Sequence, residues 1–219
     1  MDSYDILMEF FIEILATLSG GKLNAFGVIV VLAFGLLMSA VAIFGAVLVS
    51  KFTNKNIKLA MTAAVFTALA LITTPFFNNA YCSYMRNTLV YMDKLLGDYY
   101  TSITQLSQDF SMYAAGASIQ ILLINAGSAF VLISMILTLV LTGKCFKSKN
   151  LKFKALPIVA FILVFVRHFA LSNIAVSYIP TIPVLNNVFK VVQLCVFDVA
   201  FVVPYILLIP FAILNRNRA

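Results

Sequence analysis

Five long apolar segments constrain this chain more than any other feature. A helix of about 20 apolar residues crosses a bilayer core about 30 Å thick. Lipid offers no partner for backbone polar groups, so a spanning segment must satisfy them internally, as a helix does. The segments predict an all-α integral membrane protein, a single polytopic domain over 1–219. Its transmembrane helices are expected at 25–50, 57–77, 114–142, 156–176 and 191–214.

The composition excludes other classes of protein. Hydrophobic residues make up 63% of the chain and charged residues 11%, whereas a soluble domain is about half apolar and about a quarter charged. A soluble enzyme and a disordered chain are both excluded. The net charge of +7 could suit a nucleic-acid binder, but the basic residues gather in the gaps between apolar segments. We therefore expect the lipid bilayer as a partner, and no nucleic acid.

The placement of basic residues also predicts an orientation. They occupy the gaps after the first and third apolar segments and the C-terminus, whereas most acids lie near the N-terminus and in 78–113. Under the positive-inside rule, the N-terminus is outside and the C-terminus cytoplasmic, in a cytoplasmic (inner) membrane. Five spans also require opposite termini. The densest gap either sets this topology or binds anionic lipid, at about 1 kcal/mol per lysine; it holds Lys144, Lys147, Lys149, Lys152 and Lys154.

Two segments outside the spans have helical periodicity. Residues 1–20 place acids at every fourth position opposite an apolar stripe, which predicts an amphipathic helix that lies at the interface or docks on a partner. Residues 78–113 contain two such stretches around Gly97 and Asp98. We expect a two-helix cap on the outer face, either a lid or a binding surface, with Pro75 ending the span before it.

Small residues recur at helical spacing within three of the spans. Because lipid gives no hydrophobic drive for association, membrane helices pack through small side chains that let their backbones approach. These stripes predict a tight bundle, an oligomer, or both. They comprise Gly35, Ser39, Ala42 and Ala46 in the first span, Ala60, Ala64 and Thr67 in the second, and Ser134, Thr138 and Thr142 in the third.

Ionisable residues inside the spans are the candidate site. Arg167 and His168 lie near the middle of the fourth span, and Asp198 lies in the outer half of the fifth. Similar depth on neighbouring antiparallel spans predicts an Arg167–Asp198 pair, because a lone charge at the bilayer centre costs about 2.5–3.5 kcal/mol. With Gln120 and Asn125 they could form one polar layer. That layer would serve either as an ion or proton path or as a structural element that fixes helix register.

No catalytic, cofactor or metal motif is present: the chain has no H-E-x-x-H, Gly-rich phosphate loop or paired carboxylates, and its three cysteines lack C-x-x-C spacing. We therefore expect no enzyme. The expected layout resembles the polytopic inner-membrane subunit of bacterial type IV secretion channels. That resemblance implies a subunit of a secretion, channel or membrane-effector complex that works as a homo-oligomer or with other subunits. The alternative is a small ion or proton channel or transporter.

Overall fold

The computed structural model describes residues 22–50, 57–96, 103–147, 152–174 and 183–215. Helices α2, α3, α4 and α6 are long and apolar enough to cross a membrane, so the chain is a multi-pass membrane protein and the all-α prediction is confirmed. The predicted amphipathic helix at 1–20 and the break at Gly97 and Asp98 lie outside the described residues. The helices within them are α2 (Ala25–Val49), α3 (Ile57–Leu96), α4 (Ile103–Lys147), α5 (Ala155–Ile174) and α6 (Pro183–Leu214).

The fifth expected span, 156–176, corresponds to α5. This helix has 20 residues, about the minimum that crosses a bilayer core, but only its first part, Ala155–Val166, is described as a continuous apolar stretch. A fifth crossing therefore stays a prediction. Helix α6 begins well before the predicted start of the last span, at Pro183, a position where proline loses nothing because the first turn has no backbone acceptor for its N–H.

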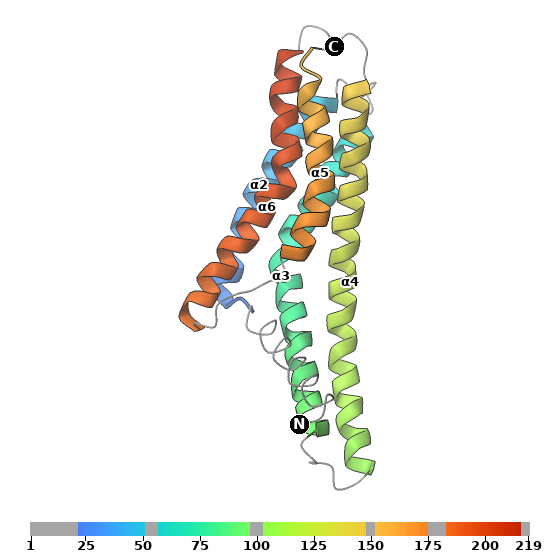
Figure 1. The fold of residues 1–219 in the computed structure, drawn as a ribbon, viewed down its shortest axis with the longest axis vertical. Coiled ribbons are helices and arrows are strands. Elements are labelled where there is room, and N and C mark those ends of the chain that lie inside the picture. Colours follow the sequence, from blue (N-terminus) through green and yellow to red (C-terminus); the bar gives the residue numbers. More distant parts are fainter. Residues whose placement is uncertain (1–21, 51–56, 97–102, 148–151, 175–182, 216–219) are drawn as a thin grey trace, which may run out of the picture.

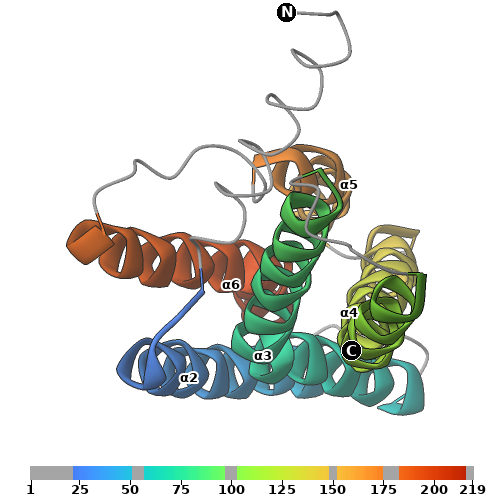
Figure 2. The same cartoon turned by 90° about the horizontal axis from the view of Figure 1, so that it is seen from below.

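Helix α3 is the centre of the bundle and packs against α2, α4 and α6, while α5 lies against α4 and α6. Figure 2 shows α2 and α6 side by side and α4 apart from both. Towards the lower end of Figure 1, α2 and α6 lean away from α4. Side chains from α4 and α6 therefore meet near the upper end of the bundle, where the cytoplasmic lysines were expected.

Helices α3 and α4 are much longer than the predicted spans. With 40 and 45 residues they reach about 60 and 67 Å at about 1.5 Å per residue, against about 40–45 Å for a bilayer with its headgroups. Both extend past the lower ends of α2 and α6 (Figure 1). The prediction that Pro75 ends the second span is wrong, because α3 continues through it.

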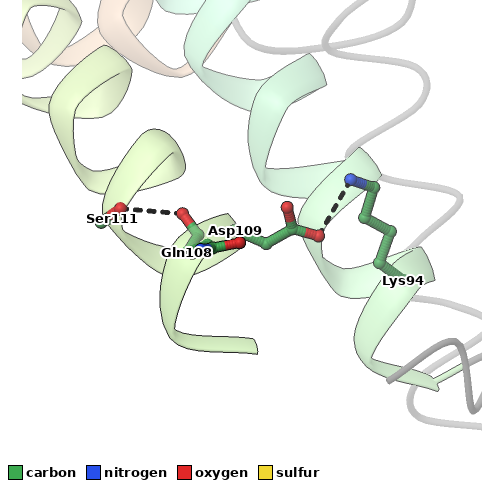
Figure 3. A network of polar contacts seen from close by, with 4 residues as sticks. All are labelled: Lys94, Gln108, Asp109 and Ser111. Carbon is green, nitrogen blue, oxygen red and sulfur yellow. Dashed lines mark hydrogen bonds and ion pairs between the residues drawn. The ribbon is translucent and has the colours of Figure 1, made fainter. Parts of the chain in front are cut away.

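The part of α3 and α4 that extends past α2 forms an antiparallel pair, which we call the projecting hairpin (residues 80–96 and 103–120). The rings of Tyr91 and Tyr113 stack across it with centroids 4.7 Å apart. Lys94 forms an ion pair with Asp109 at 3.2 Å (Figure 3). Helices over most of 78–113 are thus confirmed, but they continue the spans instead of folding into a separate cap.

The start of α2 is held against α3 by one amide. The backbone N–H of Leu23 donates to Asn79 Oδ1 at 2.7 Å, and Asn79 Nδ2 donates to the Leu23 carbonyl at 3.1 Å. Asn24 then caps α2, its side chain accepting from the Gly27 N–H at 2.7 Å, which satisfies one of the N–H groups that a helix start leaves unpaired. Asn79 therefore marks the level on α3 at which α2 begins, and the projecting hairpin extends past it towards the lower end of Figure 1.

The predicted small-residue stripes lie at helix contacts, as expected for a tight bundle. Every member of the three stripes is buried. The closest approach of a glycine to the backbone of another helix is at Gly35, where an added Cβ would lie 2.9 Å from the Leu71 carbonyl oxygen of α3. A second close approach joins Gly45 of α2 to the backbone of Tyr205 on α6, 3.1 Å from an added Cβ. At Gly35 a larger residue would have to displace the backbone of α3, whereas at Gly45 a small shift of α6 would be needed.

We expect Gly35→Ala to destabilise the bundle by about 1–3 kcal/mol, the range for overpacking a closely packed contact. Gly116→Ala is the matched control, because its added Cβ meets no atom closer than Asn87 Nδ2 at 3.9 Å and alanine favours helix. Thermal unfolding in detergent, followed by circular dichroism, measures both. Equal midpoints for the two variants would contradict the proposed backbone contact.

Candidate functional site: the polar face of α6

Helix α6 carries buried polar side chains along almost its whole length. Lys190, Asp198 and Tyr205 are buried within it, and Asn215 is buried directly after its last turn. We call these four residues the polar face of α6. Their positions place them at successive depths of the bundle, because each residue of a helix adds about 1.5 Å along its axis. The four polar side chains of this face are thus distributed along the length of the bundle and do not lie in one layer.

Tyr205 joins three helices through its hydroxyl. Its oxygen lies 3.0 Å from Thr67 Oγ1 of α3 and 3.1 Å from Thr138 Oγ1 of α4. Thr67 Oγ1 also lies 2.7 Å from Ser134 Oγ of α4. Thr67 and Thr138 each donate to a carbonyl one turn back on their own helix, at 2.8 and 2.7 Å. All four hydroxyls are therefore satisfied in an interior that offers no water.

Asp198 has the opposite character. It is 0% exposed, and neither carboxyl oxygen has a hydrogen-bond partner among the residues that the structure describes. Gly35 of α2 faces it, since an added Cβ there would lie 3.6 Å from Asp198 Oδ2. The Thr74 hydroxyl of α3 lies close to the carboxyl, but it donates to the Ala70 carbonyl at 2.8 Å. A buried carboxylate without partners is costly, so this group needs either a proton or a balancing cation.

The structure separates the other predicted members of the polar layer from Asp198. Gln120 Oε1 accepts from Asn87 Nδ2 at 3.4 Å within the projecting hairpin, and Asn125 is exposed on α4. The side chains of Arg167 and His168 lie outside the described part of the chain, so the predicted Arg167–Asp198 pair stays a prediction. Gln120 and Asn125 do not reach Asp198 because α4 diverges from α6 at this depth (Figure 1).

The predicted lysine gap lies at the opposite end of the molecule from the projecting hairpin. Lys144, Lys147 and Lys152 are exposed and Lys154 is half-buried, while Lys149 lies outside the described residues. The backbone of Lys152 is tied to the end of α6, because its N–H donates to Asn215 Oδ1 at 2.8 Å and its carbonyl accepts from Asn215 Nδ2 at 2.9 Å. The lysine side chains remain available to an anionic surface.

Sequence reasoning missed the hydroxyl cluster and Asn215. Thr67, Ser134 and Thr138 counted there only as small residues, and Tyr205 was given no role. The signal that could have found them is the presence of hydroxyl side chains at matching depth on three spans. An unpaired hydroxyl within a bilayer is costly, so such groups tend to bond one another. Among the described residues, no three His, Cys, Asp or Glu side chains lie close enough to hold a metal ion.

Comparisons of the chain with protein-family models, with curated proteins and with solved structures gave no match. The functional argument therefore depends on the chemistry and geometry of the chain itself.

Tyr205→Phe removes one hydroxyl and keeps the buried ring. We expect it to lower the free energy of unfolding by about 0.6–1.7 kcal/mol, as for hydrogen bonds within membranes, because Thr67 and Thr138 keep their carbonyl acceptors. Tyr205→Ala should lower it by about 3–5 kcal/mol, since it also leaves a cavity. Unfolding in mixed micelles measures both. If Tyr205→Phe were as destabilising as Tyr205→Ala, the ring would contribute nothing and this account would be wrong.

Proposed function

We propose that this chain is a non-enzymatic integral membrane subunit that works by assembly, with further copies of itself or with other membrane proteins. The projecting hairpin carries this proposal. It carries α3 and α4 past the start of α2, and beyond the level of Cys82, which lies near Lys22 and Lys190, the two helices pair with each other through Tyr91–Tyr113 and Lys94–Asp109. A rigid two-helix extension with no domain of its own provides a surface through which a membrane subunit can bind a partner.

The α4 side of this extension carries an apolar stripe. Met112, Ile119 and Leu122 lie on one helical face and are 67%, 65% and 70% exposed. Exposed apolar surface of this kind marks a contact with protein or lipid. Gln120 bonds Asn87, which lies further along α3 than Asn79, the residue level with the start of α2. The part of the stripe next to Gln120 therefore lies past the start of α2. This position supports a protein contact for its outer part.

A shallow groove between the two helices of the hairpin adds polar recognition groups. Its volume is about 300 Å³, and Arg86, Tyr91 and Tyr113 contribute to its lining together with the Lys94–Asp109 ion pair, so Arg86 is the basic group that this pair leaves unbalanced. Aromatic and arginine side chains are enriched at protein interfaces. An apolar stripe beside a groove with aromatic and basic groups supports a partner that presents both apolar and acidic side chains.

A triple variant tests the assembly. Met112→Ala, Ile119→Ala and Leu122→Ala together should reduce the mass of the purified complex, because they remove the apolar contacts of the stripe. Light scattering coupled to size exclusion in mild detergent gives that mass relative to the 24.1 kDa chain. The matched control is Ile29→Ala, Leu36→Ala and Leu37→Ala, which are equally apolar and exposed on α2. A wild-type chain that is strictly monomeric in detergent and in nanodiscs, and binds no partner, would contradict the proposal.

We also propose that the hairpin faces the outside and the lysine gap the cytoplasm of an inner membrane, as the positive-inside rule implies. Native Cys82 and Cys145 cannot report this, since they are 2% and 0% exposed. In a cysteine-free background, Ser107→Cys should react with an impermeant maleimide in intact cells. Lys147→Cys should react only after permeabilisation, because both native side chains are exposed but at opposite ends. Labelling of both in intact cells would exclude the orientation.

A second candidate function is the translocation of an ion or proton. The observation that favours it is Asp198, a buried carboxyl without a hydrogen-bond partner among the described residues, on the same helical face as Lys190 and Tyr205. Ionisable groups within a membrane commonly mark ion or proton paths. The flux measurement that tests this function accompanies the binding experiment of the next subsection, because both use Asp198.

A further inference from the structure

The hydrogen-bond ladder of α3 is interrupted beside Asp198. Pro75 lies inside α3 and has no N–H to donate to the carbonyl of Leu71, four residues earlier. Leu71 is fully buried, and its carbonyl oxygen faces Gly35 of α2, 2.9 Å from the position of an added Cβ. An acceptor without its usual helical donor therefore points into the contact between α2 and α3.

The carboxyl of Asp198 reaches the same point from α6. The position that a Cβ would take on Gly35 lies 3.6 Å from Asp198 Oδ2 as well as 2.9 Å from the Leu71 oxygen. The Thr74 hydroxyl lies near the carboxyl, and because it donates its hydrogen to Ala70 at 2.8 Å, only its lone pairs remain for another ligand. The Leu71 carbonyl oxygen and the Asp198 carboxyl thus approach each other beside Gly35, with the Thr74 hydroxyl near the carboxyl, and no described donor serves the carboxyl.

Oxygen acceptors without donors are the ligand set of a hard cation. Carbonyls freed from a helix also bind Na⁺ in membrane proteins, where half-helix ends and interrupted backbone provide the ligands. A single carboxylate balances one positive charge, whereas divalent ions in proteins take several carboxylates or a full oxygen cage. The chemistry of this space therefore favours a monovalent ion, with water completing its coordination.

We propose that Asp198, the Leu71 carbonyl and the Thr74 hydroxyl form a sodium site where α2, α3 and α6 meet. Gly35 lets α2 approach α3 closely enough to bring these oxygens together, Pro75 frees the carbonyl, and Asp198 provides the balancing charge. This site deepens the second candidate function, the translocation of an ion. Only its role in translocation rests on that function, because an ion bound here can stabilise the bundle without crossing the membrane.

Sodium-dependent stability of the full-length chain tests the site. In detergent at constant ionic strength, the thermal midpoint of the wild type should rise with NaCl and reach a plateau, because a ligand that binds only the folded state stabilises it. Choline chloride should produce no rise. Bound radioactive sodium, measured by scintillation proximity, should be displaced by unlabelled NaCl but not by choline chloride.

Variants locate the ion. Asp198→Asn should abolish both the stability response and the binding. Thr74→Val should weaken sodium binding about tenfold, the factor for losing one contact of hydrogen-bond strength. The matched controls are Asp109→Asn, whose carboxylate pairs with Lys94 in the hairpin, and Thr62→Val, whose hydroxyl donates to Lys58 on the exposed side of the same helix. Both controls should keep the wild-type response. If Asp198→Asn does not fold, the sodium responses of Thr74→Val and Thr62→Val are compared instead, and equal responses would reject the site.

Three results would overturn the sodium site. These are a wild-type midpoint identical in NaCl and choline chloride, an equal rise with KCl, and an unchanged response in Asp198→Asn. A midpoint that follows pH but not NaCl would assign the site to a proton and likewise reject sodium. Flux in liposomes is read separately. Sodium binding without Asp198-dependent flux keeps the site and rejects translocation, whereas Asp198-dependent flux without sodium binding keeps translocation and rejects the site.

Discussion

Close approach of helix backbones at small residues is the interaction on which this bundle depends. Lipid is as apolar as a leucine side chain, so helices gain little from burying apolar surface and instead gain from van der Waals contact. Gly35 lies against the Leu71 carbonyl and Gly45 against the backbone of Tyr205. These two contacts join α2 to α3 and to α6, and every polar group of the core sits within the arrangement they create.

The core then divides its polar groups into two kinds. Tyr205 and its partners form a closed set of hydroxyls in which every donor finds an acceptor, so this part specifies register without needing a ligand. Asp198 lies towards the hairpin end on the same helix and has no such partners among the described residues. The hydrogen-bonded hydroxyl cluster holds α3, α4 and α6 together. The Asp198 carboxyl is the group at which, in our proposal, a bound ion changes the stability of the bundle.

The sequence predicted the rough positions of the four helices that are long and apolar enough to cross a membrane, because apolar length follows directly from the physics of a bilayer. It failed at Pro75, since a helix in contact with other helices tolerates the missing hydrogen bond. The depth estimates for Gln120 and Asn125 did not anticipate that Gln120 would bond Asn87 in the hairpin or that Asn125 would be exposed. They assumed that the third span starts near residue 114, whereas α4 begins at Ile103 and has no boundary there. The tilt that separates α4 from α6 is a property of packing, and no local pattern encodes it.

Two asparagines act on segments that precede helices, at opposite ends of the bundle. Asn79 bonds both the N–H and the carbonyl of Leu23 before α2, and Asn215 bonds both groups of Lys152 before α5. A side-chain amide offers the same donor and acceptor as a peptide group. Each asparagine therefore makes, from another helix, the two hydrogen bonds that a backbone partner would make. Helices α2 and α5 therefore cannot slide lengthwise without breaking a paired bond. The two side chains thus fix the lengthwise register of α2 and α5 within the bundle.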